Sequence, residues 1–189
     1  LQYHTNEGGS WVNETITDTT KVEGYDPAMA MDGDGNLYVA HYCSSGCNDL
    51  RLSSRMNGVW QNETVSSTND IGQDPDIAID SQGTIHIVSR YASLSSGRIY
   101  LHSGTPGSWT VNTGLGGGNA YWPVVGVDSN DAVHISYHRS WTYKNVMYMT
   151  NASGSWSTAS IIENRGGWGS EMVIDCLLYT SDAADDDVR

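Results

Sequence analysis

The stretch GQDPDIAID at residues 72–80 decides the fold, because closely similar stretches recur along the chain. They are GYDPAMAMD at 24–32, AYWPVVGVD at 120–128 and the incomplete copy GWGSEMVID at 167–175. Two kinds of residue, an aspartate and a tryptophan, recur along the chain with nearly the same period, and such a shared period predicts an array of structural repeats. The aspartates that end the copies, spaced 48, 48 and 47 residues apart, are Asp32, Asp80, Asp128 and Asp175. The tryptophans that recur in step, spaced 49, 49 and 47, are Trp11, Trp60, Trp109 and Trp156.

Each repeat contains four strand-like runs separated by turn signals. In the unit at 72–116, runs over 76–79, 84–91, 98–102 and 108–113 are separated by loops of Gly, Ser, Pro and Asp. One strand and its turn in about a dozen residues is the rhythm of a four-stranded antiparallel sheet. The sequence therefore predicts an all-β fold, a partial β-propeller of four-stranded antiparallel blades.

The repeat also sets the expected domain boundaries. Residues 1–175 are predicted to form the β-propeller fragment, which starts and stops within a blade, so that the remaining blades of the parent chain are missing. Residues 176–189 break the pattern and look like a translated transposase-type sequencing adaptor, so we interpret them as the artefactual tail of an environmental gene fragment. The blades are expected at about 1–18 (partial), 24–67, 72–116, 120–163 and 167–175 (partial).

The first strand of each unit alternates large and small residues. Ile77 and Ile79 share one face, and Ala78 lies between them on the other. A strand with neighbours on both sides needs small residues where the neighbour's large ones enter. The prolines of the motif are expected to begin these strands, where a missing N–H costs no ladder bond. The tryptophan markers are expected to pack at the outer strand.

The aspartate that ends each copy opens a turn, and two uses of it are considered. Such an aspartate accepts hydrogen bonds from backbone N–H groups further along the turn. Calcium binding by Asp32 and Asp34 would need more oxygen ligands than this turn offers, so turn capping is preferred. His86 and His134 occupy equivalent repeat positions, with Tyr38 in the same place, which favours a structural slot over metal or acid–base chemistry.

The chain is acidic, with a formal net charge of −13 over 189 residues. Duplex nucleic acid is bound through Lys and Arg that neutralise phosphates, so no nucleic-acid partner is expected. No apolar run is long enough to span a bilayer, and no signal-peptide core is present. We read the acidity as a solubility feature, and no cofactor is expected.

Outside the tail, the cysteines are Cys43 and Cys47. A metal site is the weaker interpretation, because no second Cys/His pair stands nearby at ligand spacing. A short-range disulfide that closes a loop is favoured, and it suits an extracellular or cell-surface protein. Arg51, Arg55 and Arg98 are expected at the surface.

The motifs resemble a known family. The pattern Pro-x-Ile-Ala-x-Asp-x-x-Gly-x-x-His-Ile-x-Tyr, followed by Leu-x-Tyr-x-Thr-Asn-x-x-Gly-x-Trp, is seen best over residues 125–137 and 146–156. It resembles secreted β-propellers of the BNR/sialidase-like group and related propeller lectins. The true Asp-box, Ser-x-Asp-x-Gly-x-Thr-Trp, does not occur. The resemblance covers residues 1–175 and implies a fold, whereas activity has to be argued from the site.

Strand alternation predicts which loops share an end of the propeller. The loops between units and those between the second and third strands lie together, and they are variable and aromatic. Variable loops on a rigid scaffold are where binding residues gather, and aromatic rings with nearby polar groups suit sugars. The predicted ligand-binding residues are Trp122, Trp141, Tyr121, His138, Arg139, Arg90 and Tyr91, with Tyr25, Tyr42, Tyr143 and Trp168 in the same set of loops.

Three functions remain open from the sequence. The favoured one is a non-catalytic, exported propeller module that binds a carbohydrate or another cell-surface ligand. The second is a fragment of a sialidase-like glycoside hydrolase, which would need three arginines, a tyrosine nucleophile with a nearby Glu, and an acid. No such catalytic set, and no metal site, emerges from the residues. The third is a purely structural repeat of a large surface protein.

Overall fold

Strands alone make up the regular structure in the computed structural model, which describes residues 1–17, 20–68, 70–91, 97–117, 119–139, 145–162, 169 and 171–174. Every strand pairing is antiparallel. In this part of the chain no helix is long and apolar enough to cross a membrane. The all-β fold with four-stranded antiparallel sheets is thus confirmed.

The first sheet is a hairpin, and each later sheet takes four consecutive strands in simple chain order. The first sheet comprises β1 (Gln2–Thr5) and β2 (Val12–Thr15). The second comprises β3 (Val22–Met31), β4 (Leu37–Ser45), β5 (Asp49–Met56) and β6 (Val59–Ser66). The third comprises β7 (Ile71–Ile79), β8 (Ile85–Tyr91), β9 (Ile99–Thr105) and β10 (Ser108–Leu115). The fourth comprises β11 (Ala120–Val127), β12 (Val133–Arg139), β13 (Asn145–Thr150) and β14 (Ser157–Ile162).

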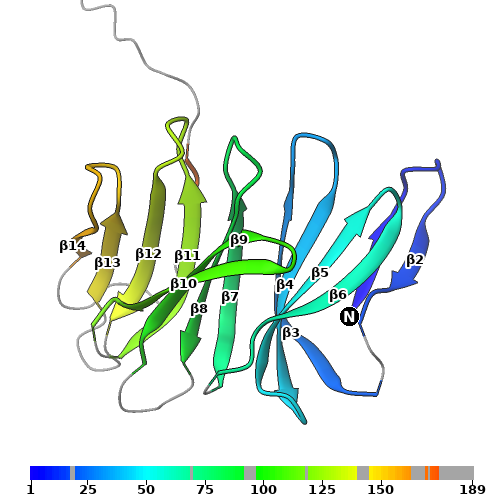
Figure 1. Ribbon diagram of the computed structural model, residues 1–189, viewed down its shortest axis with the longest axis horizontal. Coiled ribbons are helices and arrows are strands. Elements are labelled where there is room, and N and C mark those ends of the chain that lie inside the picture. The colour runs from blue at the N-terminus through cyan, green and yellow to red at the C-terminus, as the bar shows by residue number, and fades with distance from the viewer. Residues whose placement is uncertain are drawn as a thin grey trace, which may run out of the picture.

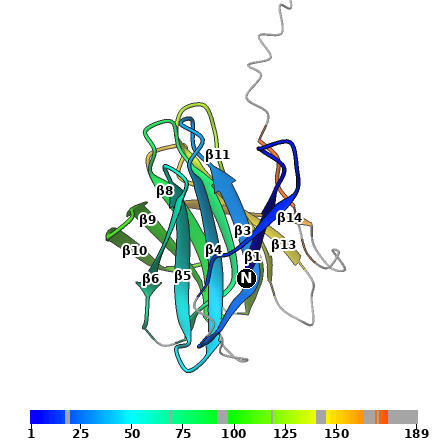
Figure 2. The ribbon, with the colours of Figure 1, turned by 90° about the vertical axis from the view of Figure 1, so that its right-hand side faces the viewer.

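The three larger sheets lie side by side, with their first strands next to one another (Figure 1). β3 contacts β7, and β7 in turn contacts β11. The β3–β4, β7–β8 and β11–β12 hairpin turns project from the same end (Figure 1). Viewed from the side, β3, β4 and β5 lie alongside one another, and neighbouring strands are antiparallel (Figure 2).

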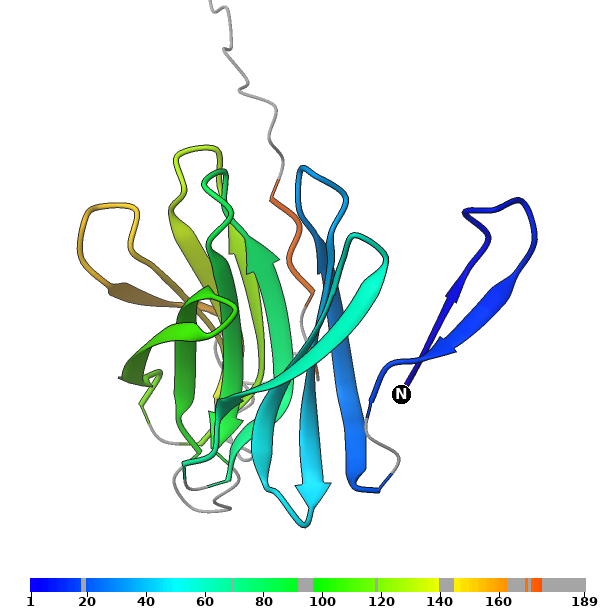
Figure 3. The same cartoon turned by 45° about the vertical axis from the view of Figure 1, so that its right-hand side comes forward.

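The predicted alternation of large and small residues is confirmed as the packing rule between sheets. Ile77 and Ile79 of β7 pack in one cluster with Ala28 and Ala30 of β3. A Cβ added to Gly126 would lie 2.7 Å from Cδ1 of Ile174, so the segment 171–174 packs against β11. This segment, orange in Figure 3, has no strand partner among the described residues. Interdigitation of this kind gives the dense packing that stabilises protein cores.

Among the described residues, the methionines of β3 have no such neighbour on their side. Met29 is 59% exposed and Met31 is 65% exposed. Their repeat equivalents Ile77 and Ile79 are mostly covered because β3 lies beside them. The difference comes from the position of β3 in the array and not from the residue type.

The prediction that the prolines begin the first strands is wrong. β7 starts at Ile71 and pairs with β8 on both sides of Pro75, with a register shift between Gln73 and Asp76. Equivalent shifts lie around Pro27 in β3 and Pro123 in β11. Proline is accepted inside a strand at a bulge because the bulged residue makes no ladder bond.

Trp60 and Trp109 lie on the outer strands β6 and β10, as predicted, and their ring nitrogens bridge neighbouring units. Nε1 of Trp60 donates to Glu14 at 2.6 Å, and Nε1 of Trp109 donates to the equivalent Glu63 at 2.9 Å. Trp156 packs against a cluster of buried residues from the third and fourth sheets, which includes Ile99 and Ile135. Trp11, in the first sheet, is 73% exposed.

Candidate functional site

Each first strand carries a bulge whose central residue has a left-handed backbone. The φ angle is 49° at Asp26, 48° at Asp74 and 47° at Trp122, and a proline follows each of them. A left-handed residue other than glycine costs roughly 1–3 kcal/mol and persists where the surrounding structure enforces it. The three positions are repeat equivalents, so the fold maintains the same strained geometry in every unit. We call residues 25–28, 73–76 and 121–124 the bulge region.

The bulge region of the three sheets opens onto one pocket of 570 Å³. Its walls come from β3, β7 and β11, with Gly169 and Glu171 from the segment that follows. All three left-handed residues line it, and we refer to it as the bulge pocket. Its remaining lining residues are Pro27, Ala28, Pro75, Asp76, Pro123 and Val124.

The bulge pocket is acidic, since Asp26, Asp74, Asp76 and Glu171 all line it. Burial raises the pKa of Asp26, and the negative charge of Asp74 raises it further. Burial also raises the pKa of Asp76, against the opposing effect of a 2.7 Å hydrogen bond from the backbone N–H of Val125. The carboxylates therefore crowd one another, and the pocket presents hydrogen-bond acceptors.

Arg90 ties the third sheet to the fourth at the rim of this pocket. Its Nε donates to Asp74 at 2.7 Å and its Nη2 donates to Gln73 at 2.7 Å. Its guanidinium carbon also lies 5.2 Å from the centroid of the Tyr121 ring. The guanidinium is thus held in place, and in turn it orients the Asp74 carboxylate.

An aromatic cluster adjoins Arg90. The Tyr121 and Trp122 rings lie 5.8 Å apart between centroids, and the Trp122 ring lies 5.8 Å from the ring of His138. His138 is buried, whereas Trp122 is partly exposed into the pocket. A planar apolar surface thus stands beside fixed carboxylates, an arrangement that can bind a ligand with both an apolar face and hydrogen-bond donors.

The structure brings together four of the residues that the sequence predicted: Arg90, Tyr121, Trp122 and His138. Tyr91 and Arg139 each follow one residue after a member of this group, so they point to the opposite face of their strands. Burial raises the pKa of Tyr137, and the charge of Arg139, on the same face of β12, opposes part of that rise. Trp141, Tyr143 and Trp168 lie outside the described residues.

Asp26, Asp74 and Gln73 also belong to the site, but they were not among the residues predicted from the sequence. The sequence did contain a signal for this position. The residue before the motif proline is Asp in two of the complete copies and Trp in the third, so it varies while the rest of the motif stays similar. Beside it, the cross-strand pairs Tyr25–Tyr42, Gln73–Arg90 and Tyr121–His138 occupy equivalent places in register. Each unit therefore contributes a different set of side chains from the same backbone position.

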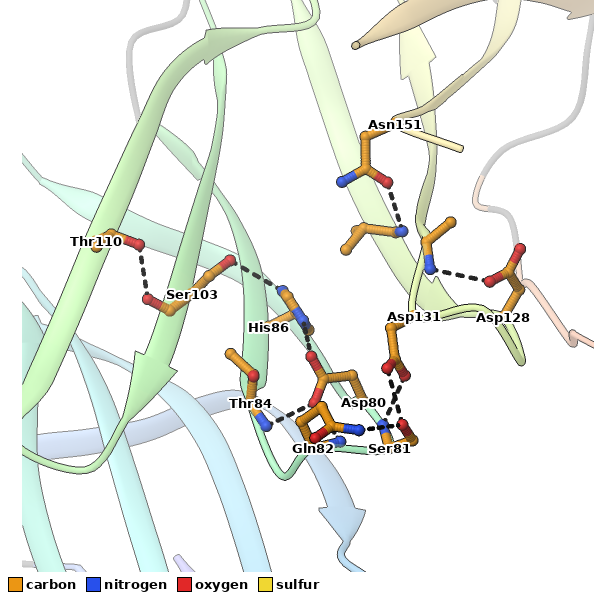
Figure 4. Close-up of polar contacts among 12 residues, drawn as sticks. Asp80, Ser81, Gln82, Thr84, His86, Ser103, Thr110, Asp128, Asp131 and Asn151 are labelled. Atoms are coloured by element: carbon orange, nitrogen blue, oxygen red, sulfur yellow. Dashed lines mark hydrogen bonds and ion pairs between the residues drawn. The ribbon is translucent and has the colours of Figure 1, made fainter. Parts of the chain in front are cut away.

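The opposite ends of the first strands, residues 32–36, 80–84 and 128–132, form what we call the turn region. Asp80 accepts hydrogen bonds from the N–H groups of Gln82 at 3.0 Å and Thr84 at 2.7 Å, and contacts Nε2 of His86 at 3.2 Å (Figure 4). Asp32 and Asp128 make equivalent bonds, with Tyr38 and His134 in the place of His86. Turn capping and the structural slot are confirmed, because these donors occupy the carboxylate oxygens.

The turn region also joins neighbouring units. Both carboxylate oxygens of Asp131 accept bonds from Ser81, one from its N–H and one from its hydroxyl, each at 2.8 Å (Figure 4). On the second strand of the third sheet, Nδ1 of His86 contacts the Ser103 hydroxyl at 2.9 Å. These side chains form hydrogen bonds with one another, so the turn region stabilises the fold.

Arg51 and Arg55 do not lie at the surface as predicted, because each faces an acidic partner, Arg51 within the second sheet and Arg55 across to the first sheet. Their side chains are 12% and 20% exposed, and they face Glu23 and Glu14 at 3.8 Å and 3.5 Å. Arg98 is exposed, as expected. Cys43 and Cys47 form a disulfide with their Cα atoms 5.8 Å apart.

With this geometry established, comparison with known proteins adds no identity. The chain matches no family model and no curated protein, so its function has to be argued from the bulge pocket itself.

Proposed function

We propose that the chain is a non-catalytic, exported β-propeller module that binds a carbohydrate or another cell-surface ligand in the bulge pocket. The observation that carries the proposal is the convergence of Asp26, Asp74 and Trp122 on one pocket, each held in a strained left-handed conformation. Backbone strain of this kind clusters at ligand-binding sites because preorganisation there is useful.

The propeller arrangement is part of the proposal. It is supported by β3, β7 and β11, which lie next to one another, and by the similar four-stranded unit behind each of them. In a propeller the first strands surround the axis, and the bulge pocket would then open at the axial channel. Export is supported by the Cys43–Cys47 disulfide, because disulfides persist in oxidising compartments.

The charge of the pocket selects among sugars. Four carboxylates line it, so a sialic acid or another anionic sugar would be repelled. A neutral or amino sugar would donate hydrogen bonds from its hydroxyl or ammonium groups to these carboxylates and place its apolar face on Trp122. The favoured ligand class is therefore a neutral or amino sugar.

The sialidase-like hydrolase receives no support from this site. That activity needs free arginines to bind a carboxylate, whereas Arg90 is engaged by Asp74 and Gln73. Arg139 is exposed on the other face of its strand and does not join it.

A glycan array with neutral, amino and sialylated sugars tests the proposal. The parent chain should bind neutral or amino sugars, and Trp122→Ala should weaken binding about fivefold or more, because one aromatic contact contributes about 1 kcal/mol or more. Trp11→Ala is the matched control, since it removes an exposed tryptophan far from the pocket in the chain.

Two outcomes would overturn the proposal. One is binding that Trp122→Ala and Trp11→Ala reduce equally. The other is selective binding of sialylated sugars, which would show that the acidic pocket is not the site and would favour the hydrolase-like interpretation.

A further inference from the structure

Three potential metal ligands meet at one end of the second sheet. Glu23 of β3 lies directly opposite Cys43 of β4 in register, and Cys47 lies in the turn that follows β4. A carboxylate oxygen of Glu23 and the two sulfur atoms lie within 4.8 Å of one another. This Glu23–Cys43–Cys47 cluster is separate from the residues that line the bulge pocket.

The Glu23 carboxylate lacks the partners that its burial requires. Its side chain is 0% exposed, and neither oxygen accepts a hydrogen bond from any described residue. Its nearest cation is Nη2 of Arg51 at 3.8 Å, and Nε of Arg51 also has no acceptor. A buried carboxylate without hydrogen bonds costs several kcal/mol, so its retention calls for another explanation.

The repeat shows that the fold does not require these residues. In the third sheet, Ile71 pairs with Tyr91 at the position where Glu23 pairs with Cys43. A pair with neither a charge nor a sulfur atom is therefore compatible with the same backbone. The charged and sulfur-bearing version in the second sheet departs from the local packing rule, and such departures mark functional positions.

We propose that, when the disulfide is reduced, Cys43, Cys47 and Glu23 bind a thiophilic divalent cation such as Zn²⁺. A dithiol reductant supplies two electrons and two protons to the sulfur–sulfur bond and is itself oxidised to a disulfide. Each thiol then releases its proton as its sulfur binds the metal, while the Glu23 carboxylate donates an oxygen. Two thiolates and a carboxylate are a ligand set that suits Zn²⁺.

Geometry and charge both permit this site. Ligand atoms around tetrahedral Zn²⁺ are about 3.5 Å apart. On reduction the two bonded sulfur atoms therefore have to separate to that spacing, while the Glu23 oxygen already lies within 4.8 Å of both. Cys47 is partly exposed, which leaves a path for the metal and for a water as fourth ligand. With Zn²⁺ bound, two thiolates, Glu23, Arg51 and the metal sum to zero charge, as Glu23 and Arg51 do in the disulfide form.

The test uses Co²⁺ as a spectroscopic probe on the full chain, with Cys176→Ser to remove the remaining cysteine. After reduction by a dithiol and its removal without oxygen, one Co²⁺ per chain should bind and produce thiolate-to-cobalt charge transfer and tetrahedral d–d bands. Zn²⁺ should displace the cobalt and raise the melting temperature of the reduced protein. The oxidised protein should show none of these effects.

Two substitutions separate the carboxylate from the thiolates. Glu23→Asp keeps the charge that faces Arg51 but shortens the side chain, so it should weaken Co²⁺ binding about tenfold. Glu7→Asp, at an exposed carboxylate, should leave binding unchanged. The proposal is overturned if the reduced protein shows no charge-transfer band, if Zn²⁺ does not raise its melting temperature, or if Glu23→Asp binds as tightly as the parent.

Discussion

The turn region and the bulge region lie on the same first strands, yet they repeat in different ways. In the turn region, Asp32, Asp80 and Asp128 make nearly identical bonds in all three units. In the bulge region the backbone repeats, with φ near 48° at Asp74 and at its equivalents, but the side chains change. Repeated bonding maintains the fold, whereas changing side chains on a fixed backbone provide binding chemistry.

The two regions also respond to protons in opposite directions. Burial acts to raise the pKa of Asp80, but hydrogen bonds from Thr84 and its neighbours outweigh it and lower the pKa. In Asp128 the hydrogen bond from Ala132 is the main cause of the lowered pKa. Asp26 and Asp76 have raised pKa values because of burial. Protonation of the aspartates in acid therefore removes stabilising hydrogen bonds in the turn region, whereas in the bulge region it removes the cost of burying charged carboxylates.

The largest effect of acid is expected from the interior between these regions. Burial lowers the pKa of both His41 and His102 to about 4, and the charge of Arg51 adds to the shift of His41. Between pH 6.5 and 4 the unfolded chain binds more protons than the folded chain does. The free energy of unfolding therefore decreases as the pH is lowered, by up to about 3 kcal/mol for each ring. Denaturant unfolding across this range measures the loss.

Variants of the histidines sharpen that measurement. His102→Leu should remove about half of the pH-dependent loss, and His4→Gln, at an exposed position, should leave it unchanged. If His102→Leu loses as much stability between pH 6.5 and 4 as the parent chain does, the turn aspartates and not the buried rings would be responsible.

The next largest effect comes from one substitution made in both regions. Asp80→Asn should cost about 1–2 kcal/mol, because it weakens charged hydrogen bonds to Gln82, Thr84 and His86. Asp26→Asn should be neutral or slightly stabilising, since it relieves repulsion from Asp74. Urea unfolding compares the two. Equal losses would remove the distinction between the regions.

A smaller gain is expected when the strain in the bulge region is relieved. Asp26→Gly should stabilise the fold by about 0.5 kcal/mol, because glycine adopts φ of 49° without a steric cost. Asn57→Gly, at φ of 52° in the β5–β6 turn, should give a similar gain without affecting sugar binding. Thermal unfolding and the glycan array together distinguish strain from ligand contact. A loss of stability in Asp26→Gly would contradict the strain argument.

The smallest expected effect is a difference in pKa between the aspartates of the two regions, which changes the free energy of unfolding only slightly. In carboxyl-detected NMR, Asp26 and Asp76 should titrate above 3.8, whereas Asp32 and Asp128 should titrate below it. If the pKa values of Asp26 and Asp76 were as low as those of Asp32 and Asp128, the carboxylates of the bulge pocket would be less buried than the structure indicates.

The sequence was sufficient for features that depend on residue type and period. Four strands per unit, the capping role of Asp80 and the fit of Ile77 against Ala28 all follow from turn chemistry and alternation. Arg90, Tyr121, Trp122 and His138 were also found from alternation, because strand pairing places Tyr121 opposite His138.

The remaining features depend on contacts that alternation does not encode. Pro75 looked like a strand start because proline removes an N–H, but pairing resumes beyond the bulge. Arg51 looked like a surface residue because its partner Glu23 is 28 residues away in the chain. Acidic residues at the bulge were missed because Asp before Pro is a common turn pair.

The packing of large residues onto small ones gives the array a direction. One side of a unit offers protruding side chains such as Met29 and Met31, and the other offers shallow positions such as Gly126. Two protruding sides would collide, and two shallow sides would leave an empty seam. Any further unit that joins at either face, from the same polypeptide or another, must therefore arrive head to tail and cannot be inverted.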